Sequence, residues 1–166
     1  MTDLKSLDSY YNKQANQYKN SRIPSKIEIY DLTLEADGEE MAGLRFKHQD
    51  RIEIARTLDQ AGIHRMAIIG NSPTPTRGDI YSAEKIVELG LKTRTSGFVK
   101  TKEEITICHE IGIKDIVILV GVNESTFTRG LNKSNVLDAS KDLIDHGKNL
   151  GLHVTFMGMD TTRASP

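Results

Sequence analysis

A short glycine-centred phrase occurs four times in this 166-residue chain and constrains its fold more than any other feature. Each copy follows a stretch with helical spacing of apolar residues and precedes a short apolar or β-branched run. Glycine commonly ends helices because it adopts a left-handed backbone without strain. The glycines therefore indicate where helices end and strands begin. The copies are AGIH (61–64), LGLK (89–92), IGIK (111–114) and LGLH (150–153).

The same alternation predicts the secondary structure along the chain. Helices are expected at 46–61, 80–89, 101–111 and 134–150, and strands at 26–32, 64–70, 92–98, 114–122 and 152–159. Strands that alternate with helices pair in parallel through right-handed crossovers. The sequence thus predicts an α/β fold with about five parallel strands and four helices, either as an open doubly wound sheet or as a (β/α) barrel.

The lengths of the connections favour the barrel. Segments after strands are long and polar, as at 35–45 and 71–79, whereas those after helices have one or two residues around the glycine. In a TIM barrel the strand-to-helix loops build a site at one rim. No Gly-x-Gly-x-x-Gly motif follows the first strand, so the dinucleotide-binding fingerprint is missing. We therefore expect a partial TIM barrel.

A complete eight-unit barrel takes more than about 200 residues, so we expect two unpaired sheet edges. Either the sequence is the front part of a longer protein, or the barrel is completed by pairing with another chain or as a homo-oligomer. Residues 26–166 are expected to form the partial TIM-barrel domain. Residues 1–25 are expected to form a polar leader, either a short helix that packs on the barrel or a partner, or a mobile tail.

The charge balance and apolar runs exclude several classes of partner. Lys plus Arg number 22 and Asp plus Glu number 23, so neither nucleic acid nor an anionic membrane is an expected partner. There is no apolar run of membrane-spanning length and no secretory-signal pattern, which predicts a cytoplasmic protein. The single cysteine, Cys108, lies on an apolar helix face and is expected to be a buried packing residue rather than a reactive thiol.

Four segments resemble the barrel domain of the isopropylmalate, homocitrate and citramalate synthases, a pyruvate carboxyltransferase-type family of metal-dependent TIM barrels. The resemblance runs from about residue 26 to the end of the chain. It is carried by IYDLTLEADGEEMAG (29–43), IEIARTLDQAGIHRM (52–66), GIKDIVILVGVNES (112–125) and LGLHVTFMGMDTTR (150–163). It implies a 2-isopropylmalate synthase-like acyltransferase, as used in leucine biosynthesis, that condenses acyl-CoA with a 2-oxo acid.

The resemblance also implies a divalent metal, because a 2-oxo acid chelates a cation that then acts as a Lewis acid. Oxygen and histidine ligands suit Mg, Mn or Zn. Alignment on Asp-Gly assigns Asp37 as a metal ligand, although Asp-Gly is also a common turn pair. Acyl-CoA would be the co-substrate.

This sequence departs from the family pattern at several positions. Ala36 stands where the family has arginine, the spacing from Asp31 to Asp37 is one residue longer, and Met159 replaces a functional glutamate. None of the five histidines forms the His-x-His metal pair of a later strand. Asp31 itself either supports a metal ligand or pairs with an arginine of the rim, or else it is a helix- or turn-capping acid.

The remaining candidate residues lie in the segments after the strands. Arg45 is a candidate catalytic residue that replaces the missing arginine, or else an exposed residue at a helix start. Arg77 is a candidate substrate-binding residue in the loop after the second strand, which is otherwise a rigid surface connection. After the fifth strand, Asp160 is a candidate catalytic residue, and Thr161 and Arg163 are candidates for holding a substrate carboxylate.

Two functional hypotheses follow. In the first, the chain is a barrel-type acyl-CoA:2-oxo acid synthase. In the second, it is a catalytically incompetent half-barrel that acts as a structural or regulatory subunit.

Overall fold

The computed structural model describes residues 26–35, 43–70, 75–123, 127 and 131–164. Within these ranges five parallel strands form one sheet in the order β1-β2-β3-β4-β5. The strands are β1 (Tyr30–Asp31), β2 (Arg65–Ile69), β3 (Arg94–Val99), β4 (Asp115–Gly121) and β5 (His153–Met159). The α-helices are α2 (His48–Gln60), α3 (Arg77–Glu88), α4 (Lys102–Glu110) and α5 (Val136–Asn149), and the 3-10 helix η1 (Thr161–Arg163) follows β5. The leader predicted for 1–25 lies outside the described residues.

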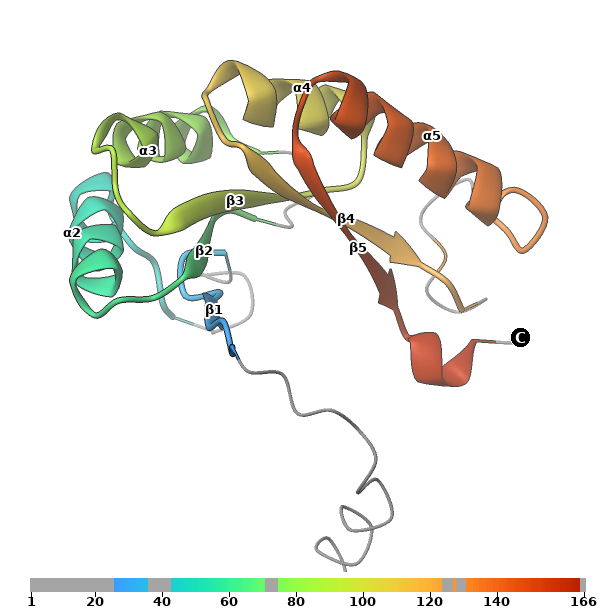
Figure 1. Ribbon diagram of the computed structural model, residues 1–166, viewed down its shortest axis with the longest axis horizontal. Helices are drawn as coiled ribbons and strands as arrows, with labels where there is room; N and C mark the ends of the chain where they lie inside the picture. Colours follow the sequence, from blue (N-terminus) through green and yellow to red (C-terminus); the bar gives the residue numbers. More distant parts are fainter. Residues whose placement is uncertain (1–25, 36–42, 71–74, 124–126, 128–130, 165–166) are drawn as a thin grey trace, which may run out of the picture.

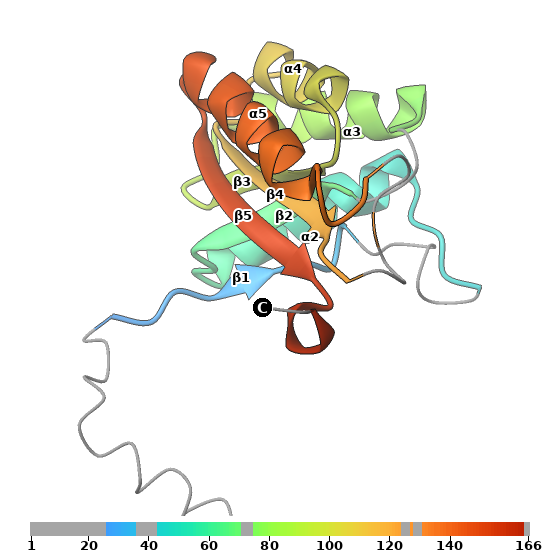
Figure 2. The ribbon, with the colours of Figure 1, turned by 90° about the vertical axis from the view of Figure 1, so that its right-hand side faces the viewer.

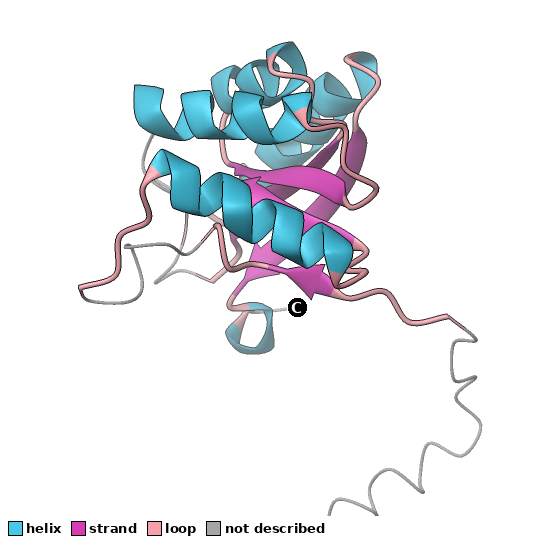
Figure 3. Cartoon of the chain, turned by 90° about the vertical axis from the view of Figure 1, so that its left-hand side faces the viewer, coloured by secondary structure: helices cyan, strands magenta, loops and turns pink. Residues whose placement is uncertain are grey.

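The four helices cover one face of a curved sheet, and the opposite face is left concave (Figures 1 and 3). Each helix connects one strand to the next, as the repeat predicts. Figure 2 shows β5 at one margin of the sheet. The predicted partial TIM barrel is therefore confirmed. None of the helices in the described ranges is long and apolar enough to cross a membrane.

The helix ends follow the repeated glycines. Gly62, Gly90, Gly112 and Gly151 each have a positive φ, from 61° to 91°. Each lies directly after a helix C-cap and before a strand. The prediction that these glycines stop the helices is confirmed.

The first strand is shorter than expected. Only Tyr30 and Asp31 of the predicted strand 26–32 pair with β2, and residues 26–29 are not assigned to a strand. The reason is that Arg65 is where β2 begins, so residues before Tyr30 have no β2 residue beside them.

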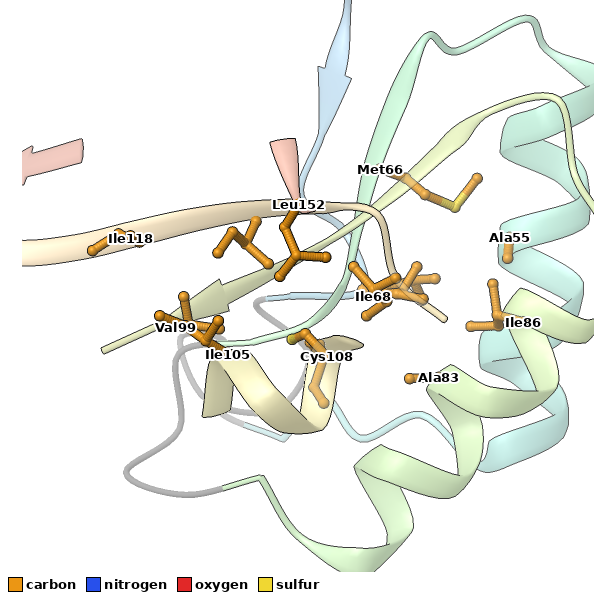
Figure 4. Close-up of a cluster of buried hydrophobic side chains, with 14 of the residues drawn as sticks. Ala55, Met66, Ile68, Ala83, Ile86, Val99, Ile105, Cys108, Ile118 and Leu152 are labelled. Carbon is orange, nitrogen blue, oxygen red and sulfur yellow. The ribbon is translucent and has the colours of Figure 1, made fainter. Parts of the chain in front are cut away.

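The main hydrophobic core lies between the sheet and the helices (Figure 4). Ile68 and Ile118 of the sheet are fully buried there, as are Ile86 of α3 and Ile105 of α4. Burying one such side chain contributes about 1.5–3 kcal/mol. Cys108 of α4 belongs to this core, and burial raises its pKa to about 12. The expectation of a buried cysteine is confirmed.

A second, smaller cluster lies on the concave face. It contains Ala67, Phe98, Val117 and Leu119, with Tyr30 packed against it. The rings of Tyr30 and Phe98 are stacked, with centroids 6.2 Å apart. The concave face of the sheet is thus apolar near its middle.

A polar network lies beside this cluster, toward the amino ends of the strands. Arg65 forms an ion pair with the buried Asp115, donates a hydrogen bond to Thr155 Oγ1 (3.2 Å) and lies 4.3 Å from the ring centroid of Tyr30. His153 Nδ1 lies 3.1 Å from Asp115 Oδ1. The network joins β2, β4 and β5 across the concave face. Its position at the amino ends indicates a stabilising role, since barrel enzymes place their chemistry at the carboxyl ends.

Candidate functional site

The carboxyl ends of all five strands lie along one rim of the sheet, because the strands are parallel. A cavity of about 1000 Å³ lies at this rim beside the ends of β1 and β2 and the first turns of α2 and α3. Its lining is rich in charged groups of both signs. These include Glu35, Arg45, Lys47, His48, Arg51 and Asp79.

Arg51 holds the wall of this cavity together. Its side chain is buried and donates hydrogen bonds from Nη2 to the carbonyl oxygens of Leu34 (3.1 Å) and Ile68 (2.9 Å). Leu34 lies in the turn after β1, and Ile68 lies in β2 where the register with β3 shifts. One guanidinium group thus joins two adjacent strand ends at carbonyls of the rim.

His48 also lines the cavity, and its ring is fixed by three neighbours. Its Nδ1 lies 2.6 Å from the buried Ser82 Oγ, which donates its own proton to the Gly78 carbonyl (2.9 Å). Ser82 Oγ is thereby placed to accept a hydrogen bond from His48 Nδ1. Tyr81 packs edge-on against the ring at 5.4 Å. A Cβ at Gly78 would lie 3.2 Å from His48 Cε1, so glycine makes room for the histidine.

The turn after β1 shows what Asp31 does. Its carboxylate accepts hydrogen bonds from the backbone N–H (3.0 Å) and the hydroxyl (3.2 Å) of Thr33. Of the two interpretations of Asp31, the turn-capping acid is the one this geometry supports. Asp37, the predicted metal ligand, lies outside the described residues.

The other candidate residues of the rim follow β5. Asp160 has a left-handed backbone (φ 65°), and its Oδ1 accepts from Arg163 Nε at 2.6 Å. Its Oδ2 is buried and has no hydrogen-bond partner among the described residues. Thr161 Oγ1 donates to the Gly158 carbonyl (2.7 Å), and Asn123 Nδ2 donates to the Arg163 carbonyl (2.6 Å). The ends of β4 and β5 are thereby joined.

The structure divides the sequence candidates into two groups at the rim. Arg45 is exposed and lines the cavity at the β1–β2 side. Arg77 is also exposed, but it is the first residue of α3 and not a loop residue as predicted, because the Thr76 side chain caps the helix one turn earlier than expected. Asp160 and Arg163 lie at β5, on the far side of the strand order. The described residues therefore do not bring the two groups into contact.

Sequence reasoning missed Arg51, His48 and Ser82. His48 and Ser82 are 34 positions apart and come from different helices, so their contact has no signal in the local sequence. Arg51 occupies the helix face expected to be apolar, and a basic residue among apolar neighbours was the available signal.

The described residues do not by themselves fit a divalent metal ion. No group of three or more His, Cys, Asp or Glu side chains within them is arranged to hold one. Asp31 is engaged by Thr33 and Asp160 by Arg163, and the two lie on opposite margins of the sheet. These positions therefore do not form a metal site by themselves.

The chain is similar in sequence to curated enzymes of archaea. It is 28% identical over 144 residues to a probable 2-isopropylmalate synthase of Methanosarcina acetivorans, covering 85% of this chain and 27% of that protein. It is 26% identical over 157 residues to homocitrate synthase AksA of Methanothermobacter thermautotrophicus, covering 93% of this chain and 39% of that protein. The chain thus spans well under half the length of these relatives.

Similarity to solved structures concerns the fold alone. An HMG-CoA lyase of Bacillus subtilis superposes with a TM-score of 0.65 at 15% identity, covering 83% of this chain and 48% of that chain. DHDPS from Cyanidioschyzon merolae superposes with a TM-score of 0.57 at 12% identity, covering 78% of this chain and 45% of that chain. The family model described as HMGL-like matches residues 26–166, which is most of the sequence. On that match, the chain belongs to the HMGL-like family.

Proposed function

We propose that this chain provides part of an acyl-CoA:2-oxo acid condensing site of the 2-isopropylmalate synthase type. The observation that carries the proposal is the family match over residues 26–166, whose relatives include 2-isopropylmalate and homocitrate synthases. In this reaction the α-carbon of acyl-CoA loses a proton and attacks the keto carbon of the 2-oxo acid, whose oxygen takes up a proton to become a hydroxyl. Water then cleaves the thioester, which releases CoA and a hydroxylated dicarboxylic acid.

The rim residues would bind and orient the anionic substrates. Arg45 and Arg77 are exposed cations near the ends of β1 and β2, where they would neutralise carboxylate or phosphate groups. Thr161 and the exposed Arg163 would hold the carboxylate of the 2-oxo acid, and Asp160 keeps Arg163 in place through its ion pair. Asp160 is thus proposed to act in catalysis by positioning that arginine.

A divalent ion, Mg, Mn or Zn, belongs to the proposal, with Asp37 as one ligand. When bound, it would polarise the keto group of the 2-oxo acid. The other ligands would come from strands beyond the five described here. Those strands would be supplied by another copy, by another chain or by further sequence, with the whole enzyme acting in the cytoplasm.

One feature of the sequence favours a second function. Ala36 replaces the arginine and Met159 the glutamate that the family pattern places at these positions. A chain with both changes would serve as a structural or regulatory half-barrel without turnover of its own.

The test is CoA release from acetyl-CoA and 2-oxoisovalerate, with manganese or magnesium, detected with a thiol reagent. The buried Cys108 thiol should contribute little background. Asp37→Asn should reduce the rate at least about 100-fold if Asp37 binds the metal. Arg163→Ala should mainly raise KM for the 2-oxo acid, whereas Asp145→Asn, an exposed change on α5, should have no effect. Absence of CoA release from the folded chain with every 2-oxo acid tried would favour the second function.

A further inference from the structure

The cavity at the ends of β1 and β2 is larger than the proposed keto acid requires. Its volume is about 1000 Å³, at the upper end of the range for small-molecule pockets. A small 2-oxo acid would fill only a fraction of that space, whereas a nucleotide has a suitable size. The cavity lies between the first turns of α2 and α3, which are neighbours over the sheet (Figure 1). It is therefore wide enough for the bulkier of the two proposed substrates, acyl-CoA.

One wall of this cavity alternates apolar and basic side chains. Leu44 and Phe46 are partly buried, and Phe46 packs against the main core. Arg45 and Lys47, which lie between and after them, are exposed. All four residues line the cavity. An apolar surface next to two cations suits a ligand that has both a flat aromatic part and an anionic part.

The charges of the lining favour an anionic ligand. Neither Arg45 nor Lys47 has an ion-pair partner among the described residues. The acidic residues of the lining are Glu35 and Asp79. The Asp79 carboxylate already accepts hydrogen bonds from the backbone N–H (2.8 Å) and the hydroxyl (2.7 Å) of Thr76. Phosphate groups would therefore supply negative charge to two cations that are otherwise solvated.

His48 adds a hydrogen-bonding group with a fixed direction. Its ring lines the cavity and is held by Ser82 Oγ at Nδ1 (2.6 Å) and by the edge-on contact with Tyr81. In its protonated form the ring donates from both nitrogens. Nε2 can then donate to a phosphate oxygen while Nδ1 stays bonded to Ser82. The imidazole thus needs no rearrangement to take part in binding an anion.

We propose that this cavity binds the nucleotide end of acyl-CoA, with Arg45, Lys47 and His48 around its phosphate groups. The adenine ring lies against Leu44 and Phe46. CoA is a long molecule, so its thioester can reach the ends of the strands while its nucleotide stays at the outer rim. The choice of CoA rests on the proposed function, but binding can be measured without turnover. Intact binding without condensation would count against the proposed function alone, and condensation without binding here would count against this site alone.

The test measures how adenosine 3′,5′-bisphosphate, a fragment of CoA, binds to the full chain by isothermal titration calorimetry. Arg45→Ala and Lys47→Ala should each weaken binding about 10-fold, because each removes a charge-assisted contact to phosphate. Lys148→Ala is the matched control, since this lysine is also exposed but lies in the last turn of α5. It should leave the affinity unchanged. Circular dichroism establishes that each variant is folded, as expected for changes at exposed positions.

The histidines locate the ligand independently of these substitutions. The ring resonances of His48 should shift in NMR spectra as the bisphosphate is added, and His48→Gln identifies them. His64 and His153 lie at the amino ends of β2 and β5, away from the cavity, so their resonances should stay in place. Shifts at His64 or His153 without a shift at His48 would contradict the proposed location.

Competition experiments distinguish CoA from other sources of phosphate. CoA itself should displace the bisphosphate, whereas AMP, which lacks the 3′-phosphate, should bind more weakly. Inorganic pyrophosphate, which lacks the adenosine, should also bind more weakly. AMP that binds as tightly as the bisphosphate would assign the cavity to an ordinary nucleotide, and equally tight pyrophosphate would assign it to anions in general. Either result would overturn the proposal.

Two further results would also overturn it. The first is a folded wild-type chain that does not bind the bisphosphate at about 1 mM, which is roughly the weak limit of specific binding. The second is equal affinity of the wild-type chain, Arg45→Ala and Lys47→Ala, which would place the ligand elsewhere on the molecule.

Discussion

Strands β4 and β5 have the same length and pair with each other along all seven residues, yet their environments differ completely. Every residue of β4 is buried, whereas none of β5 is. β4 has a strand on each side and helices over one face, whereas β5 has a strand on one side only among the described residues. Burial of a barrel strand therefore depends on its neighbours more than on its own apolar residues.

The largest difference between the two strands should appear at Asp115. Asp115→Ala on β4 leaves Arg65 without its buried partner and should lower the free energy of unfolding by about 3–5 kcal/mol. Thr155→Ala on β5 removes one hydrogen bond of the same network and should cost about 0.5–1.5 kcal/mol. Urea unfolding followed by circular dichroism measures both. Equal losses would contradict the greater importance of β4, which has a strand on each side.

Truncation of apolar side chains should give the next largest contrast. Ile118→Ala creates a cavity in the main core and should cost about 2–5 kcal/mol. Phe156→Ala removes more atoms, but from an exposed position, and should change the stability of the single chain by less than about 1 kcal/mol. The comparison is made by urea unfolding followed by circular dichroism. A loss at Phe156 as large as that at Ile118 would mean that the β5 margin is packed as tightly as the main core.

Glycines test how tightly each strand is packed. A Cβ at Gly97 on β3 would lie 2.6 Å from Ile69 Cγ2 and 2.7 Å from Cys108 Sγ, so Gly97→Ala should cost about 1–3 kcal/mol. At Gly158 on β5 the nearest atom would be the Thr161 hydroxyl at 3.0 Å, and Gly158→Ala should cost clearly less. Thermal unfolding distinguishes the two. The reverse order would show that the end of β5 is the more rigid region.

The smallest effect concerns the alkaline pH dependence of the core. Burial raises the pKa of Cys108 from 9.0 to about 12, so the folded state holds a proton that the unfolded chain releases near pH 9. The stabilisation of the folded state by the protonated Cys108 thiol is fully present below pH 9 and is lost as the pH rises toward 12. Stability should fall by up to about 1 kcal/mol between pH 8 and 9.5. Cys108→Ala should flatten that slope, and an unchanged slope would assign it to another group.

The repeating architecture could be predicted from the sequence because each helix–glycine–strand unit has a local sequence pattern. A helix that ends at Gly62 or Gly112 and runs into an apolar strand needs no distant contact to be recognised. The contacts that shape the rim are different, since His48 meets Ser82 and Arg51 meets Ile68 across separate elements. The short β1 also escaped prediction, because strand length depends on where the neighbouring strand begins.

Arg51 has a practical consequence for altering this protein. Its guanidinium holds the carbonyl of Leu34, just before the segment that carries Asp37, beside the carbonyl of Ile68 in β2. A replacement for residues 36–42 can therefore be grafted after a fixed entry point, provided that this arginine is retained. In loop libraries that lack Arg51, the backbone at Leu34 would vary together with the loop.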